Sequence, residues 1–249
     1  MLYWNKIKFL NKQKINIKLD ILSKSLVTVP AAPAFIENKL NPYYWDAVRD
    51  ADCNIIDSSL FVLLCKVKGY KLFKYSGYKL IHDLVDYLKR NSLKVLLVNP
   101  TEKSSIINRE FLRNNTKLEK IDIECYTAPI YPKDSKIEDQ ILLQMITNLN
   151  PDLVLINIAG GKQEILGHWL KNRAMSSITI ICTGAAISFF TGEQVKMPNW
   201  MDKFYLGWLA RIIHNPRVFI PRYIKALRMV ALFFNYSNTL TEEKEGYGK

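Results

Sequence analysis

The chain has 249 residues, 49% of them hydrophobic, and a formal net charge of +12, so it can bury a sizeable core and suits an anionic partner. It contains no uninterrupted apolar run of 18 residues and no signal-peptide pattern at its N-terminus, which argues against a membrane-spanning helix and against secretion. The four cysteines are widely spaced and the three histidines are scattered, which argues against a metal cluster and predicts reduced thiols in the cytoplasm.

Short apolar runs rich in β-branched residues predict strands at Leu26–Val29, Cys53–Ile56, Lys94–Val98, Ile121–Tyr126, Leu153–Ile158 and Ile178–Cys182. Most of these runs are separated by segments with helical spacing of apolar residues, such as Tyr78–Arg90 and Ile137–Leu149. Strands that alternate with helices predict an α/β fold, Rossmann-like, with a largely parallel sheet wrapped by helices. Because crossover connections are right-handed, the loops that follow the strands should lie at one edge of the sheet.

The loops at that edge hold the candidate ligand-binding residues. They contain Thr28, Asp57, Asn99–Thr101, Gly160–Glu164 and Thr183–Ala186. In one of them, Gly160 and Gly161 lack side chains and let the backbone approach a ligand closely. Gln163 and Glu164 then offer hydrogen-bonding groups at the start of a helix. The alternative is a plain connection between strand and helix with an exposed polar pair.

From Pro198 onward the chain changes character. Residues 199–213 combine aromatic and basic side chains, and residues 217–234 repeat apolar residues at helical spacing with Arg222, Lys225 and Arg228 between them. A cationic amphipathic helix with an aromatic-rich companion is typical of a protein that lies on a membrane surface. The alternative is a pair of helices that covers the core.

The positive charge is concentrated in two places. Residues 1–24 carry +5 and residues 196–228 carry +6, whereas residues 25–195 carry only +2. We therefore expect a basic N-terminal segment (1–24), a Rossmann-like core (25–195), a membrane-associating helical appendage (196–235) and a disordered tail (236–249). Basic flanks suit a membrane surface or nucleic acid. The sequence shows no helix-turn-helix, zinc-finger or aromatic RNA-binding motif, so nucleic acid is the weaker candidate.

A series of short motifs runs through residues 25–230. They are Val27-Thr28, Ile56-Asp57-Ser58, Lys74–Lys79, Lys162-Gln163-Glu164, Thr183–Ala186, Phe189–Gly192, Lys196-Met197-Pro198, Gly207–Arg211, Pro216-Arg217 and Arg222-Tyr223. In their order and spacing they resemble the WecG/TagA/CpsF family of bacterial glycosyltransferases (glycosyltransferase family 26). The resemblance covers nearly all of the chain apart from its ends.

The resemblance implies a hexosyltransferase of bacterial surface polysaccharide synthesis. Members of the family transfer a sugar from a UDP-sugar to a polyprenyl-diphosphate-linked saccharide, with inversion and with no metal or other cofactor. Such an enzyme would work in the cytoplasm at the inner face of the cell membrane, where its acceptor and an anionic lipid surface are found. Members of the family can associate, so a homo-oligomer is a further expectation.

The resemblance also assigns roles to single residues. Asp57 is the expected catalytic base; the alternative is that it caps the helix that begins near Ser59. Without a metal the departing diphosphate needs cations, and the matching basic positions are Lys74, Lys196, Arg211, Arg217 and Arg222. Thr28 and Gln163 are expected to hydrogen-bond the sugar or the base, and Glu164 to orient Gln163 or to cap its own helix. The remaining substrate-binding positions are Gly160, Lys162, Thr183, Gly184 and Ala185.

Several positions depart from the family pattern. Among them, Asn157 stands for a Gly, Gly161 for a Pro, Lys79 for an Asp, Lys196 for an Arg and Gly207 for a Glu. They call into question the family's usual donor, a UDP-linked N-acetylmannosamine derivative. Lys79 and Gly207, together with Pro30 in place of the family's Asn, also favour an alternative function, a degenerate, non-catalytic protein that binds a nucleotide sugar or scaffolds a polysaccharide assembly. Retention of Asp57 and Gln163 favours the enzyme.

Overall fold

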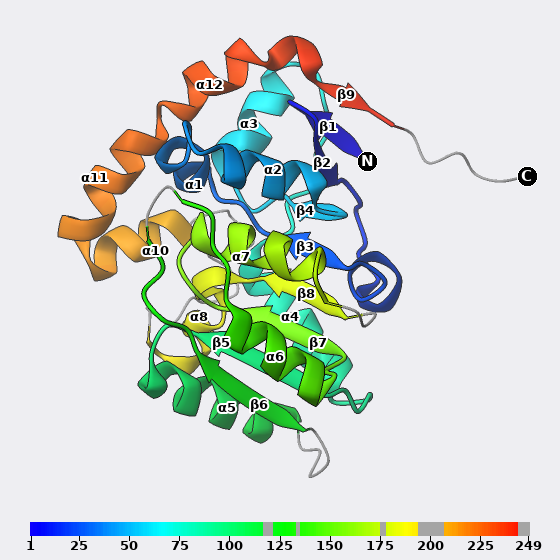
Figure 1. The fold of residues 1–249 in the computed structure, drawn as a ribbon. Helices are drawn as coiled ribbons and strands as arrows, with labels where there is room; N and C mark the ends of the chain where they lie inside the picture. The colour runs from blue at the N-terminus through cyan, green and yellow to red at the C-terminus, as the bar shows by residue number, and fades with distance from the viewer. Residues whose placement is uncertain (117–121, 133–134, 175–177, 194–206, 244–249) are drawn as a thin grey trace, which may run out of the picture.

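The computed structural model describes residues 1–116, 122–132, 135–174, 178–193 and 207–243. These residues form one mixed, mostly parallel sheet with helices on both faces (Figure 1), which confirms the predicted α/β, Rossmann-like fold. The strands are β1 (Leu2–Trp4), β2 (Ile7–Leu10), β3 (Leu26–Thr28), β4 (Cys53–Ile55), β5 (Val95–Asn99), β6 (Ile123–Thr127), β7 (Leu153–Ile156), β8 (Thr179–Cys182) and β9 (Thr241–Glu242). Their order in the sheet is β6-β5-β7-β8-β3-β4-β2-β1-β9.

All six predicted strands are present, as β3 to β8, and every pairing from β6 across to β2 is parallel. The sheet separates two layers of apolar side chains because neighbouring residues of a strand point to opposite faces. In β7, for example, Val154 and Ile156 belong to one core cluster, and Leu153 and Leu155 belong to the other. All four side chains are fully buried, as expected for a central strand covered on both faces.

Helices cover each layer. The first face is covered by α1 (Ala32–Glu37), α2 (Pro42–Asp50), α3 (Ser59–Val67), α6 (Gln140–Leu149), α7 (Lys162–Lys171) and α12 (Met229–Asn235). The second is covered by the π-helical turn η1 (Ile17–Ile21), α4 (Gly77–Leu88), α5 (Glu102–Thr116), the 3₁₀ turn η2 (Gly184–Ala186) and α8 (Ser188–Thr191). The helices predicted at Tyr78–Arg90 and Ile137–Leu149 correspond to α4 and α6.

The first ten residues of the basic N-terminal segment form two strands of the sheet, although the charge of this segment set it apart in the sequence. β1 and β2 form a hairpin whose turn residues, Asn5 and Lys6, both have positive φ, as in the tight turns that suit hairpin twist. Leu2, Trp4 and Ile7 are fully buried. Lys6 and Lys8 therefore lie on a hairpin that packs against the core.

The C-terminal part divides into a buried and an exposed portion. The predicted helical stretch 217–234 is two helices, α11 (Pro216–Ala226) and α12, preceded by α10 (Gly207–His214). Met229 and Phe233 of α12 are fully buried, and Phe233 stacks on Trp4 at 6.0 Å between ring centroids. In contrast Ile213, Ile224 and Leu227 are each at least 60% exposed. No helix in the described part of the chain is long and apolar enough to cross a membrane.

The expectation of a disordered tail from residue 236 is wrong as far as Glu243. After the 3₁₀ turn η3 (Ser237–Thr239), β9 pairs antiparallel with β1. The amino group of Met1 donates to the carbonyl of Glu243 at 2.9 Å, so the two ends of the described chain lie side by side. Backbone pairing with an edge strand orders this segment despite its polar sequence.

Candidate active site

The loops after β3, β4, β7 and β8 meet at one edge of the sheet, as predicted. Because these strands are parallel neighbours, their carboxyl ends coincide: Thr28 pairs with Asn54 on one side and with Cys182 on the other, and Cys182 pairs with Ile156. In an open α/β sheet, ligands bind in the crevice outside the carboxyl ends of the strands. The candidate site is therefore built on this edge.

Asp57 lies directly after β4 and is half-buried. Its Oδ1 accepts a hydrogen bond of 3.1 Å from the backbone N–H of Gly77, the first residue of α4. It does not cap the nearer helix, because Ser58 does so, accepting from Phe61 N at 3.2 Å. Among the described residues, Oδ2 has no hydrogen-bond donor, so this oxygen is available to a substrate hydroxyl.

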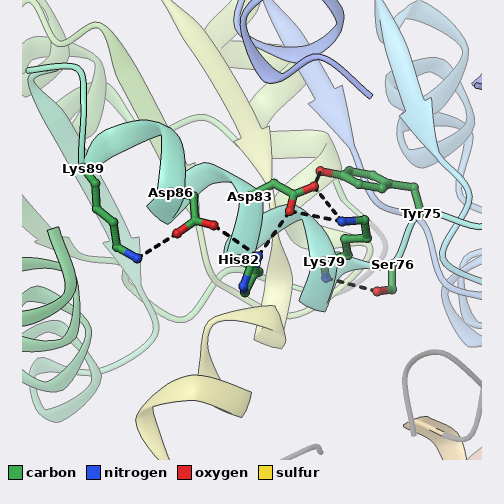
Figure 2. Close-up of polar contacts among 7 residues, drawn as sticks. All are labelled: Tyr75, Ser76, Lys79, His82, Asp83, Asp86 and Lys89. Carbon is green, nitrogen blue, oxygen red and sulfur yellow. Dashed lines mark hydrogen bonds and ion pairs between the residues drawn. The ribbon is translucent and has the colours of Figure 1, made fainter. Parts of the chain in front are cut away.

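The start of α4, which holds Asp57, is itself anchored by side chains (Figure 2). Ser76 caps the helix by accepting from Lys79 N at 3.1 Å. The hydroxyl of Tyr75 donates to Asp83 Oδ2 at 2.9 Å, and Lys79 Nζ lies 3.1 Å from the same carboxylate oxygen. Burial and the carboxylate of Asp83 raise the pKa of Tyr75, so it remains a protonated donor. These contacts fix the direction of the Gly77 N–H.

Gln163 and Glu164 are buried, with 3% and 0% of their surface exposed, so the alternative of an exposed polar pair is wrong. Gln163 Oε1 accepts from Gly184 N at 2.7 Å, and its Nε2 donates to Glu164 Oε1 at 3.0 Å. Glu164 Oε2 accepts from Gly161 N at 2.6 Å. Glu164 thus both caps its own helix and orients Gln163, and Gln163 holds the turn after β8. Burial raises the pKa of Glu164.

In this arrangement the N-terminus of α7 is occupied by the side chain of Glu164. The partial positive charge of a helix N-terminus attracts anions, and here the helix's own Glu164 already occupies that position. A diphosphate at this edge would therefore depend on basic side chains.

Thr28 is fully buried, and its hydroxyl is hydrogen-bonded to the side-chain oxygen of Asn54. Asn54, within β4, donates in turn to the carbonyl of Val48 at 2.8 Å. Asn54 was not among the residues predicted for the site. The only sign of its role in the sequence is that it is a polar residue inside an otherwise apolar predicted strand.

A second buried network links the ends of β5, β7 and β8. Thr183 Oγ1 donates to Asn157 Oδ1 at 2.6 Å, and Asn157 Nδ2 donates to Asn99 Oδ1 at 3.0 Å. Asn99 also accepts from Asn108 Nδ2 of α5 at 2.8 Å. The predicted ligand-lining Thr183 is thus 5% exposed and bonded inward, whereas Ala185, two residues on, is exposed.

The predicted cationic residues are spread over the molecule. Arg211 reaches the region after β8, where its guanidinium lies 4.8 Å from the ring centroid of Phe189. Arg222 Nε lies 3.4 Å from Glu37 Oε1, and Arg217 is exposed on α11. Lys74 is half-buried on the loop before α4, and Lys162 Nζ donates to the carbonyl of Tyr131. Lys196 lies outside the described residues. Of the predicted cations within the described residues, Arg211 is thus the one that lies against α8.

In the described part of the chain, no group of three or more His, Cys, Asp and Glu side chains could hold a metal ion. The cysteines are free. Burial raises the pKa of Cys53 and of Cys65 to about 12, so both are thiols rather than nucleophilic thiolates at neutral pH. Asp57 is thus a half-buried carboxylate at this edge, whereas the two buried cysteines are not activated nucleophiles.

The order of these loops is matched by one known family. The model of the glycosyl transferase WecG/TagA/CpsF family matches residues 12–243. The chain belongs to this family. The match begins after β2 and includes α10 to β9, so the family's common region extends beyond the central core.

Two curated relatives are similar to this chain over most of its length. The chain is 23% identical over 212 residues to N-acetylglucosaminyldiphosphoundecaprenol N-acetyl-beta-D-mannosaminyltransferase of Bacillus subtilis (strain 168), covering 84% of this chain and 78% of the relative. The protein of the same name from Bacillus spizizenii is also 23% identical over 212 residues, covering 82% of this chain and 79% of the relative. Both are transferases whose names specify a lipid-linked acceptor.

Within the WecG/TagA/CpsF pattern, Gly161 is the departure with the clearest structural consequence. Its φ is +90°, a value that proline, with φ near −65°, is unable to adopt. A Cβ added here would lie 2.5 Å from Asn38 Nδ2. The turn into α7 therefore has a conformation that the family's usual Pro could not take.

Proposed function

We propose that this protein is an inverting glycosyltransferase that moves a sugar from a UDP-sugar to a polyprenyl-diphosphate-linked saccharide. The observation that carries the proposal is Asp57, a half-buried carboxylate after a central strand. One of its oxygens is held by Gly77 N, and the other has no donor among the described residues. The relatives supply the acceptor class, because their names specify undecaprenol-diphosphate-linked N-acetylglucosamine.

The chemistry follows from this carboxylate. Asp57 takes the proton of the acceptor hydroxyl as that oxygen bonds to the anomeric carbon of the donor. The bond from the anomeric carbon to the UDP oxygen breaks at the same time, and UDP leaves with the bonding electron pair. A single displacement inverts the configuration at this carbon, and the proton remains on Asp57 until solvent removes it.

The negative charge on the departing UDP requires stabilisation. Arg211, whose guanidinium lies over Phe189 of α8, is the first candidate, because guanidinium groups bind phosphate oxygens in pairs. Arg217, Arg222, Lys74 and Lys196 are further candidates. No metal ion is required in this scheme, since these cations supply the charge.

The acceptor's lipid places the reaction at a membrane. α10, α11 and the two residues after α11 expose Trp208, Ile213, Ile220, Ile224 and Leu227, and Arg217, Lys225 and Arg228 lie among them. Apolar side chains with interleaved cations suit the headgroup region of an anionic membrane. We therefore propose peripheral association with the inner face of the cell membrane, with α12 covering the core and α10 and α11 contacting lipid.

The membrane contact is tested by flotation with anionic and with neutral vesicles. Ile224→Asp should lower binding to anionic vesicles, because it places a carboxylate within the apolar surface. Ile106→Asp is the matched control, since Ile106 is 55% exposed on α5, a helix outside the proposed contact. Equal binding of the two variants would contradict the contact.

The transfer reaction is tested by UDP release from a panel of UDP-sugars, with and without a short polyprenyl-diphosphate-linked N-acetylglucosamine. Release that requires acceptor would support a transferase and identify its donor sugar. Inversion is read from the anomeric configuration of the product, and metal independence from release in the presence of a chelator. UDP-sugar binding with no release for any donor would instead support the non-catalytic alternative.

A further inference from the structure

The helix α3 is apolar on most of its surface, including the side that faces solvent. Phe61, Leu64 and Cys65 are buried against the core. On the other side Leu63 and Val67, one helical turn apart, are 56% and 68% exposed. A helix at the surface of a globular protein normally places polar residues on its solvent face, so the exposed apolar face of α3 indicates a surface that binds a partner.

A stripe of exposed apolar residues runs along α11 and α12 and ends beside α3. Its members recur at helical spacing: Ile220, Ile224, Leu227, Ala231 and Phe234. Leu227 and Arg228, which lie between the two helices, have right-handed helical backbone angles, so the spacing is kept across the junction. The stripe therefore faces solvent on both helices, while the opposite side of α12 covers the core.

α12 connects this stripe to α3, which lies beside it (Figure 1). Phe233 packs inward, and its ring centroid lies 5.7 Å from that of Phe61 of α3. The next residue, Phe234, is exposed, and Nζ of Lys68, directly after α3, lies 5.4 Å from its ring centroid. The exposed sides of α11, α12 and α3 thus form one surface.

The charge of this surface indicates what it binds. Residues 58–76, which include α3, contain four lysines and no acidic residue. Residues 216–240, which include α11 and α12, contain four basic residues and no acidic one. Lys66 and Lys68 are exposed on either side of Val67. Exposed aliphatic side chains with cations between them suit the headgroup region of an anionic membrane, which offers both apolar chains and negative charge.

We infer that the outer face of α3, formed by Leu63, Lys66, Val67 and Lys68, binds the anionic membrane surface together with α11 and α12. α3 begins two residues after Asp57, and Leu63 stands six residues after it, on the order of 10 Å along the helix. The proposed base therefore lies close to the lipid surface at which a lipid-linked acceptor presents its sugar. The inference rests on the proposed function only for the membrane as the place of the reaction. It adds a helix of the core to a contact that the sequence predicted for the C-terminal segment alone.

Binding is measured by flotation of the full chain with two kinds of vesicle, phosphatidylcholine alone and equal parts of phosphatidylcholine and phosphatidylglycerol. Leu63→Asp places a carboxylate within the apolar face of α3, so its partition coefficient onto the anionic vesicles should fall about tenfold. Ile106→Asp is the matched control, because Ile106 is similarly exposed in the interior of α5, and this variant should bind as wild type.

A charge variant tests the same face without placing a carboxylate in it. Lys66→Gln combined with Lys68→Gln should lower the partition coefficient onto anionic vesicles about tenfold or more and leave that onto neutral vesicles unchanged. Lys103→Gln combined with Arg113→Gln removes the same charge from exposed positions of α5. This control should bind both kinds of vesicle as wild type.

The outcomes separate α3 from the C-terminal helices and from the transfer reaction. Loss of binding in Ile224→Asp but in neither α3 variant would overturn the inference and leave the proposed contact of α10 and α11 in place. Equal losses in the α3 variants and the α5 controls would also overturn it. A changed sedimentation coefficient of lipid-free Leu63→Asp, with unchanged flotation, would assign the face to a second copy of the chain instead. Flotation does not depend on sugar transfer, so a protein that transfers no sugar would still support or refute this contact.

Discussion

The ends of β4 and β7 each place a carboxylate near the same edge of the sheet, yet the two groups have different surroundings. Asp57 is half-buried and, within the part of the chain that the structure describes, accepts one hydrogen bond, from Gly77 N. Glu164 is fully buried and accepts two, from Gly161 N and Gln163 Nε2. A carboxylate with a free oxygen can exchange a proton with a substrate, whereas one enclosed by the protein's own donors fixes a loop. We therefore expect Asp57 to take part in the chemistry and Glu164 to position the loop.

The largest effect is expected for Asp57→Asn. The amide oxygen can still accept from Gly77 N, but the side chain no longer takes a proton, so kcat for acceptor-dependent UDP release should fall about 10²–10⁴-fold. The free energy of unfolding should change by less than about 0.5 kcal/mol. Asp46→Asn, on the exposed side of α2, is the control and should keep full activity. A rate for Asp57→Asn within tenfold of wild type would exclude it as the base.

For Gln163, which follows β7, we expect a loss of stability, in contrast to the loss of activity expected for Asp57→Asn. Gln163→Ala removes the acceptor of Gly184 N and a donor to Glu164, which leaves buried polar groups unpaired. We expect a loss of about 2–3 kcal/mol in the free energy of unfolding, measured by urea denaturation. Gln144→Ala, at an exposed position of α6, should change it by less than about 0.5 kcal/mol. Unaltered stability of Gln163→Ala would show that Gln163 does not hold the turn after β8.

A pair of glycine variants tests the turn between these elements. Gly161→Ala should cost about 1–2 kcal/mol, because φ is +90° and the new Cβ would meet Asn38. Gly160→Ala is the neighbouring control: its φ is not positive, and its Cβ would lie 3.6 Å from Ala34 Cβ, an ordinary contact. Thermal or urea unfolding should rank Gly161→Ala well below Gly160→Ala. Equal stability of the two would refute the strained geometry.

The smallest effect concerns pH and the raised pKa of Glu164. In the unfolded chain the pKa of Glu164 is 4.5. As pH rises above 4.5, Glu164 therefore ionises first in the unfolded chain. The contribution of protonated Glu164 to stability is then lost as pH passes the higher pKa of the folded state. The effect is limited because hydrogen bonds from Gln163 and Gly161 favour the ionised form. The stability of Glu164→Gln relative to wild type should therefore improve from pH 4 towards pH 8. An opposite or absent trend in urea unfolding would contradict the raised pKa.

The central fold was predictable because local signals agreed with the tertiary structure. The runs that became β3 to β8 are apolar and β-branched, and α4 and α6 have a clear helical repeat. β1, β2 and β9 were missed, because two to four residues with interspersed lysines and polar side chains give no distinct periodicity. They form because Trp4 packs on Phe233, which lies more than 200 residues later in the chain.

For the site, the sequence determined which residues stand at the carboxyl ends of the strands. It did not determine which of them face inward. Thr28, Gln163 and Thr183 look alike as polar loop residues, but each is buried against a partner from another strand or loop: Asn54, Gly184 and Asn157. Residue type and spacing are local properties, whereas burial and the pairing of hydrogen-bond groups depend on which strands become neighbours. Only the tertiary structure settles this, because an inward-facing polar group requires a partner brought close by the fold.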